Sequence, residues 1–162
     1  MSSTPNLSLL LPQDHIICGL PADHSKKQVI TTLAKPLLKD GIITDLDAFL
    51  HAIEHRERRM NTLVDEWIAF PHATAPEVCR LGLSVGTVAP PGCIYDAYTQ
   101  KTCRLLFLIA IPDAEPCAHL PLLTQVVGTL MDMEKRKKLL SPDVTVGGVR
   151  RLLCGKSRNQ LD

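Results

Sequence analysis

The chain lacks the features of several protein classes. Its formal net charge is only +1, so it has no strong electric field with which to hold nucleic acid or an acidic membrane. No apolar run approaches the roughly 20 residues that a bilayer-spanning helix needs. A Walker-type glycine loop, the usual cradle for nucleotide phosphates, is also missing. We therefore expect no nucleic-acid partner, no membrane insertion and no nucleotide site.

Cysteines at metal-binding or redox spacing are missing as well. The sequence has six cysteines but no C-x-x-C pair, and a disulfide framework is typical of short secreted chains. Nothing resembling a signal peptide begins the sequence. We therefore expect reduced thiols, several of them small core residues, in a cytoplasmic protein.

The length and the apolar fraction favour one folded domain. A chain of 162 residues with 45% hydrophobic residues can bury a sizeable core. We find no internal repeat and no low-complexity tract. The domain is placed at residues 7–153, with flexible termini expected at residues 1–6 and 155–162.

Apolar residues at helical spacing predict several helices. The first follows Asp23 or Ser25, either of which could be its N-cap, and Pro36 should kink it or end it early. The second opens at Asp45 and runs into the charged segment 54–59, which we interpret as a solvated helix end. Further helices are predicted at about 118–130, 134–140 and 144–153.

Alternation and apolar runs predict the strands. Residues 103–111 are nearly all apolar, which is typical of a central strand buried on both faces. Residues 81–85 alternate with glycine and serine and suggest a half-covered strand. Residues 67–70 form a short candidate strand, and residues 7–11 form either a short strand or an anchoring segment. Helices before, between and after strands indicate an α/β fold.

The most informative motif is Pro71-His72, at the end of the apolar run that starts at Ile68. Proline cannot donate to a sheet ladder, so we expect Pro71 to end the strand and His72 to lie where the chain turns away from the sheet. Arg56 upstream and His119 downstream are a cation and a second histidine that the fold could bring beside it.

The sequence resembles the enzyme IIA domain of the mannitol/fructose class in the bacterial phosphoenolpyruvate-dependent sugar phosphotransferase system, most closely its stand-alone nitrogen-related members. The resemblance spans roughly Leu7 to Leu153. It implies an α/β fold with a mixed sheet of about five strands and helices on both faces. The residues that carry it are, in chain order, Arg56-Glu57, Asn61-Thr62, Ile68 to His72, Tyr95-Asp96-Ala97, Leu105 to Ala110 and His119-Leu120.

The resemblance also implies a function. Such a phosphocarrier accepts a phosphoryl group on a histidine from an HPr-like phosphohistidine donor. It then passes the group to a IIB partner, or its phosphorylation state serves as a regulatory signal. No metal or other cofactor is needed for a transfer between histidines.

The chemistry assigns roles to four residues. Neutral imidazole is a good nucleophile near neutral pH, so His72 is expected to carry the phosphoryl group. Transfer depends on positioning and charge stabilisation, which the guanidinium of Arg56 suits. His119 can donate a further hydrogen bond at a helix start, whose free N–H groups also favour an anion. Thr62 could bond either the second nitrogen of His72 or a phosphoryl oxygen.

Each candidate also has a simpler interpretation. His72 could be an ordinary turn histidine, Arg56 could cap the C-terminal end of its helix, and His119 could be a helix-start residue without a role. His51 and His55 lie at i, i+4 and could in principle hold a metal. No third ligand is apparent nearby in the sequence, so a solvated helix face is favoured.

The loop before Pro71 departs from the family pattern. Glycines are usual where this chain has Leu63, Asp65 and Trp67, and glycine tolerates positive φ and close backbone approach. We expect Asp65 and Glu66 to lie near the phosphoryl site and to oppose a phosphate there. The alternative function is therefore a non-transferring regulatory domain of the same fold that binds a kinase, transporter or transcription factor.

Overall fold

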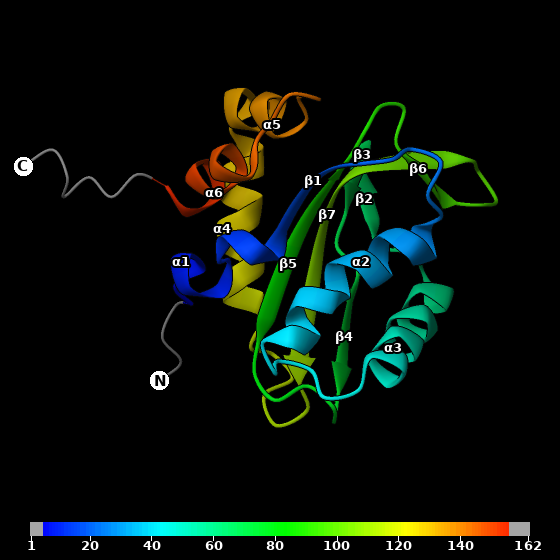
Figure 1. Ribbon diagram of the computed structural model, residues 1–162, viewed down its shortest axis with the longest axis vertical. Coiled ribbons are helices and arrows are strands. Elements are labelled where there is room, and N and C mark those ends of the chain that lie inside the picture. Colours follow the sequence, from blue (N-terminus) through cyan, green and yellow to red (C-terminus); the bar gives the residue numbers. More distant parts are fainter. Residues whose placement is uncertain (1–4, 156–162) are drawn as a thin grey trace, which may run out of the picture.

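One mixed sheet organises the protein, and strand β7 (Lys101–Pro112) is its axis. A computed structural model describes residues 5–155 (Figure 1). The strand order is β1-β5-β7-β3-β2, and β4 and β6 also pair with β7. The other strands are β1 (Ile16–Leu20), β2 (Leu63–Asp65), β3 (Trp67–Ala69), β4 (His72–Ala75), β5 (Gly82–Val88) and β6 (Cys93–Asp96).

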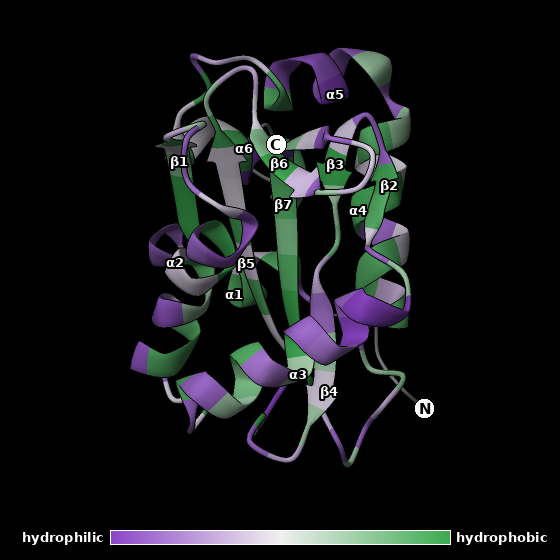
Figure 2. Ribbon diagram, turned by 90° about the vertical axis from the view of Figure 1, so that its right-hand side faces the viewer, coloured by the Kyte–Doolittle hydropathy of each residue, from purple (hydrophilic) through white to green (hydrophobic). Residues whose placement is uncertain are grey.

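Helices cover both faces of this sheet. One layer consists of α2 (Lys26–Lys39) and α3 (Leu46–Arg59), and the other of α1 (Leu7–Leu10), α4 (Leu120–Met131), α5 (Met133–Leu139) and α6 (Val146–Cys154) (Figure 1). A separate hydrophobic core fills each side. In Figure 2, β7 is hydrophobic along most of its length, whereas α5 is mainly hydrophilic. Within residues 5–155, every helix is too short or too polar to cross a bilayer.

The predicted fold class is confirmed, with seven strands among the described residues instead of about five. The central strand is confirmed too, since residues 105–112 are all buried. The prediction of a half-covered strand is wrong, because all seven residues of β5 are buried. A Cβ on Gly82 would lie 2.6 Å from the side chain of Ile42, and one on Gly86 would lie 2.7 Å from Leu33. The glycines therefore admit α2 and the segment that follows it close to the sheet, and they do not mark a solvent face.

Two predicted helix starts are confirmed by their caps. The Ser25 side chain accepts a hydrogen bond from the Gln28 N–H in a capping box at the start of α2, and Asp45 caps α3. Pro36 does not end α2 early, because the helix continues to Lys39. The proline lies in the last turn, where few later residues depend on the hydrogen bond that it cannot make.

The N-terminal segment is an anchor and not a strand. Residues 7–10 form the short helix α1, with Asn6 as its N-cap, and Leu7 and Leu11 are buried. The Pro5 carbonyl oxygen accepts a hydrogen bond from Gln125 Nε2 at 2.9 Å. Of the termini that we expected to be flexible, residues 1–4 and 156–162 lie outside the described residues.

The strand at the Pro-His motif is interrupted but not ended. Both β3 and β4 run parallel to β7, and the register continues from Ala69 opposite Leu106 to His72 opposite Ile109. Between them the Pro71 carbonyl oxygen accepts a hydrogen bond from the Ile109 N–H at 3.0 Å. The expectation that the chain turns away from the sheet at His72 is therefore wrong, because β7 provides a partner on both sides of the proline.

Candidate functional site

His72 is the first residue of β4 and is half-buried. Its Nδ1 lies 2.7 Å from the carbonyl oxygen of Phe70. Because a carbonyl oxygen can only accept, the proton of the neutral ring is on Nδ1, and Nε2 keeps its lone pair. Nε2 is therefore the ring nitrogen with a free lone pair.

The sheet brings His119 to the same side. Side chains alternate along a strand, and Ala73 lies in the core beneath α2 and α3, so His72 faces the layer that contains α4. His119 is the N-cap residue of α4. The two imidazole ring centroids lie 5.7 Å apart with 26° between the ring planes. The structure thus brings together the two histidines that the sequence placed far apart.

His119 Nδ1 is buried and has no hydrogen-bond partner within the described residues. Burial, and next the charge that His72 can carry, hold the pKa of His119 below its usual range. A neutral His119 donates one hydrogen bond and accepts another. The helix start itself contributes less than predicted, because the Leu120 N–H is bonded to the Cys117 carbonyl oxygen and Pro121 has no N–H.

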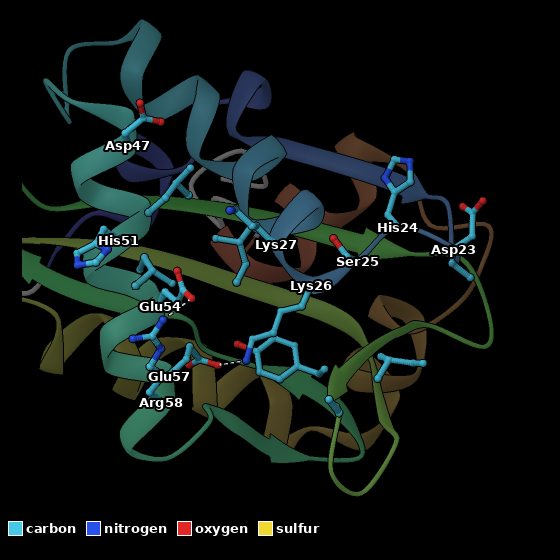
Figure 3. A pocket seen from close by; sticks show the side chains of 17 residues that line it. Asp23, His24, Ser25, Lys26, Lys27, Asp47, His51, Glu54, Glu57 and Arg58 are labelled. Atoms are coloured by element: carbon cyan, nitrogen blue, oxygen red, sulfur yellow. Dashed lines mark hydrogen bonds and ion pairs between the residues drawn. The ribbon is translucent and has the colours of Figure 1, made fainter.

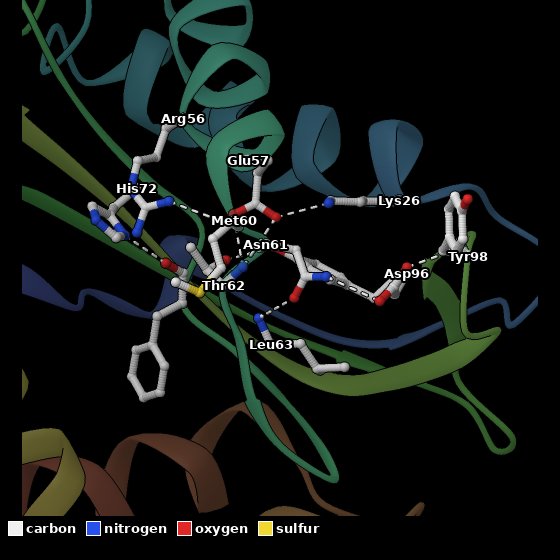
Figure 4. A network of polar contacts seen from close by, with 12 residues as sticks. Lys26, Arg56, Glu57, Met60, Asn61, Thr62, Leu63, His72, Asp96 and Tyr98 are labelled. Atoms are coloured by element: carbon white, nitrogen blue, oxygen red, sulfur yellow. Dashed lines mark hydrogen bonds and ion pairs between the residues drawn. The ribbon is translucent and has the colours of Figure 1, made fainter.

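Arg56 comes to the site from the opposite layer. It lies in the last turn of α3, which packs against β4, and in Figure 4 its side chain extends toward the His72 ring. Arg56 Nη1 donates to the Met60 carbonyl oxygen at 2.8 Å, so the guanidinium does cap the helix end. A guanidinium has five N–H donors, and this contact occupies one nitrogen of the fork.

Thr62 is not presented to His72. Thr62 is buried, and its Oγ1 lies 2.8 Å from the hydroxyl oxygen of Tyr95. One partner predicted for Thr62 is the second nitrogen of His72. That nitrogen is bonded to the Phe70 carbonyl oxygen instead. Burial, followed by the nearby charge of Glu57, raises the pKa of Tyr95, so the tyrosine stays protonated in this pair.

Glu57 belongs to the Arg-Glu motif, but the sequence predicts no role for it. Although segment 54–59 was expected to be solvated, Glu57 is only 8% exposed. Its Oε1 lies 2.7 Å from Lys26 Nζ, which sits 4.0 Å from the centre of the Tyr95 ring. The available signal was spacing: Phe49 and Ile53 are buried in α3, and Glu57 continues the same i, i+4 stripe.

Lys26 and Glu57 also border a cleft on the side of α2 and α3. The cleft measures about 850 Å³ and lies between the start of α2, one face of α3 and strand β6. Figure 3 shows it, with the ion pair of Lys26 and Glu57 at one end. The cleft belongs to the opposite layer from His119, so it is not the site of the two histidines.

The hairpin of β2 and β3 extends away from His72. Its base is closed by the Phe70 N–H, which donates to the Thr62 carbonyl oxygen at 3.0 Å. Asp65, at the tip, pairs with Arg136 of α5 at 2.9 Å. At about 3.3 Å per strand residue the tip lies roughly 10 Å beyond the base. The prediction that Asp65 and Glu66 lie near the phosphoryl site is therefore wrong.

The described residues include no group of three His, Cys, Asp or Glu side chains that could hold a metal ion. His51 and His55 are exposed on α3. The described residues thus place an unprotonated imidazole nitrogen beside a second imidazole, an arrangement that can bind an anionic group.

Residues 9–144 match the family described as "Phosphoenolpyruvate-dependent sugar phosphotransferase system, EIIA 2". A fructose-specific EIIA component from Haloferax volcanii is 32% identical over 119 residues, which cover 74% of this chain and 77% of that protein. A fructose-specific EIIABC component from Bacillus subtilis is 31% identical over 118 residues, which cover 73% of this chain but 18% of that protein. The chain therefore spans less than a fifth of the length of this Bacillus relative.

Solved structures share the fold. The complex of mannitol enzyme IIA with phosphorylated enzyme IIB from Escherichia coli matches with a TM-score of 0.74 and 25% identity, covering 91% of this chain and 100% of the matched chain. The nitrogen regulatory protein IIA-Ntr from Neisseria meningitidis matches with a TM-score of 0.76 and 21% identity, covering 91% and 98%. With two imidazoles side by side on this fold, and with residues 9–144 matched by the family model, the chain belongs to the EIIA type-2 family of the sugar phosphotransferase system.

Proposed function

We propose that the protein is a phosphocarrier in which His72 Nε2 accepts a phosphoryl group from a phosphohistidine on an HPr-like carrier. The N–P bond of the donor breaks as the Nε2–P bond forms, and the donor nitrogen keeps the electron pair. The observation that supports this most is the hydrogen bond from Nδ1 to the Phe70 carbonyl oxygen, because it leaves Nε2 unprotonated beside His119.

Two side chains would stabilise the transferred group. Negative charge develops on three equatorial oxygens during transfer, and Arg56 can present a planar fork of donors to two of them. His119 can donate from one ring nitrogen to a third. Thr62, with its hydroxyl bonded to Tyr95, is not part of this phosphoryl-binding group in the proposal.

The downstream partner is proposed from the relatives. One matched structure is a complex of enzyme IIA with phosphorylated enzyme IIB, and two relatives are fructose-specific. A IIB component of sugar uptake is therefore the receiving partner that we propose, with both partners and this protein in the cytoplasm.

A regulatory domain that does not transfer phosphate is the second candidate. Its support is the altered hairpin, where Val64 is 64% exposed and Trp67 is 40% exposed. Two exposed apolar side chains on adjacent strands could contact a kinase, transporter or transcription factor. On this proposal the hairpin, and not His72, determines binding.

A phosphorylation assay separates the two candidates. The protein is mixed with phosphorylated HPr-like carrier and followed by intact mass, and we expect a gain of one phosphoryl group. His72→Ala should gain none, whereas His51→Ala, which changes an exposed histidine of α3, should be labelled at the wild-type rate. Labelling of folded His72→Ala at an unchanged rate would refute the nucleophile, and an unlabelled wild-type protein would favour the regulatory domain.

A further inference from the structure

We propose that Glu57 is a positioning residue that fixes the proton of His72 on Nδ1, acting through the backbone of Thr62 and Phe70, the two residues that close the base of the β2–β3 hairpin. The inference deepens the proposed function and rests on it for its kinetic consequence. The proton position itself can be measured without any phosphoryl transfer.

The first step of the connection is at α3. The Glu57 carboxylate accepts a hydrogen bond from the Thr62 N–H, with Oε2 at 3.1 Å. Its other oxygen, Oε1, is paired with Lys26 Nζ at 2.7 Å. A buried carboxylate with these two partners is held in one place, and it holds the Thr62 peptide group in turn.

The second step crosses the hairpin base. The Thr62 carbonyl oxygen accepts a hydrogen bond from the Phe70 N–H at 3.0 Å, and the Phe70 carbonyl oxygen accepts from His72 Nδ1 at 2.7 Å. Figure 4 shows the polar contacts from Lys26 through Glu57 to the hairpin base and His72. Each of these bonds fixes the backbone of one residue at the hairpin base, so the position of the Glu57 carboxylate is linked to the position of the Phe70 carbonyl oxygen.

The position of the proton decides whether His72 can react. A neutral imidazole carries its proton on either nitrogen, and only the unprotonated nitrogen has a lone pair for attack. If the Phe70 carbonyl oxygen moved away, part of the population would carry the proton on Nε2 and could not accept a phosphoryl group there. After transfer the ring carries a proton on Nδ1 and phosphorus on Nε2, and the same carbonyl oxygen stabilises its positive charge.

Glu54 provides a matched control. It lies on the same helix, is exposed, and pairs with Arg58 at 2.9 Å. Replacing Glu54 by glutamine removes a charge close to Glu57 in sequence but does not touch the Thr62 N–H. A purely stabilising role of Glu57 would lower unfolding stability without moving the proton of His72.

The test is ¹⁵N NMR of the His72 ring in the full-length protein at about pH 8, where unperturbed imidazoles are neutral. The wild-type protein, Glu57→Gln and Glu54→Gln should all show the proton on Nδ1, because the glutamine amide oxygen can still accept from the Thr62 N–H. In Glu57→Ala the ratio of the Nδ1–H to the Nε2–H form should fall, by up to roughly fivefold if the hydrogen bond between His72 Nδ1 and the Phe70 carbonyl oxygen is lost.

A second variant covers the case in which Glu57→Ala does not fold. Replacing both members of a buried ion pair by apolar residues is often neutral for stability, so Lys26→Met combined with Glu57→Met should fold and still lose the acceptor for Thr62. It should show the same change of tautomer. The rate of phosphoryl transfer should fall by at most the same fivefold in this variant, because only the Nδ1–H form has a lone pair on Nε2, and it should stay near wild type in Glu57→Gln.

Two results overturn parts of the reasoning separately. An unchanged proton on Nδ1 in a folded variant that lacks the Glu57 carboxylate refutes the positioning role, whether or not His72 is phosphorylated. A wild-type protein that shows the expected tautomers but takes no phosphoryl group from the carrier refutes the proposed function and leaves the positioning role standing.

Discussion

The Trp67→Gly variant should be more stable than the Trp67→Ala variant. Trp67 has a φ of 71°, in the left-handed region that residues with a Cβ avoid. Both substitutions remove the indole and its contact with Arg104, whose Cζ lies 5.7 Å from the ring centre. The comparison of the two variants therefore isolates the backbone conformation.

The magnitude follows from two opposing effects. A Cβ in the left-handed region costs about 1–2 kcal/mol, while glycine loses about 0.5–1 kcal/mol more chain entropy than alanine on folding. The glycine variant should therefore be more stable than the alanine variant by about 0.5–1 kcal/mol. The measurement is the free energy of unfolding from urea titration, with equal m-values required for the comparison.

Val64, on the neighbouring strand, is the matched control site. It is exposed and is not among the described residues with positive φ, so here glycine should be less stable than alanine, by about 0.5–1 kcal/mol. An alanine variant at Trp67 that equals or exceeds the glycine variant in stability would show that the hairpin relaxes and stores no strain at this residue.

Three further predictions use the same assays. Arg56→Gln should slow phosphoryl transfer about 100- to 1,000-fold, as for the loss of one charge-stabilising donor, and should lower the unfolding free energy by only about 0.3–1 kcal/mol through the lost contact at the end of α3; a rate near wild type would remove Arg56 from the site. The pKa of His119 is lowered in the folded protein, so the unfolded chain binds the proton first as the pH falls. The free energy of unfolding is therefore highest above about pH 6.5 and declines as the pH falls through the folded pKa. Urea midpoints across this range should decline in the wild-type protein and change less in His119→Gln. Equal pH profiles in the two proteins would contradict the assignment of the decline to His119. Gly86→Ala should destabilise by about 1–3 kcal/mol through overpacking against Leu33, whereas Gly128→Ala, which meets no atom within 4 Å in α4, should stabilise by about 0.5–1 kcal/mol; similar effects at the two glycines would refute the packing argument.

Local signals in the sequence were sufficient for several elements. The caps at Ser25 and Asp45 depend on side chains within three residues of the groups they bond, and the burial of β7 follows from its apolar run. The sequence predicts no strand order, because nothing local specifies which strands pair.

The errors have a common physical cause, which is a partner distant in the sequence. Pro71 ends a strand by local rules, yet β7 continues to pair with the residues on both sides of it. Glu57 looks solvated beside Arg58, yet Lys26 supplies its counter-charge from another helix. The glycines of β5 suggested an open face because the approach of α2 is not visible in their own segment.

The interruption at Pro71 has a consequence for how this site can change by mutation. The atom that orients the reactive imidazole is a main-chain oxygen of Phe70, and every amino acid supplies the same oxygen at that position. No single codon change at residue 70 can delete it. Variation in reactivity among descendants of this sequence should therefore arise from residues that shift the main chain, and much less from the residue that bears the acceptor.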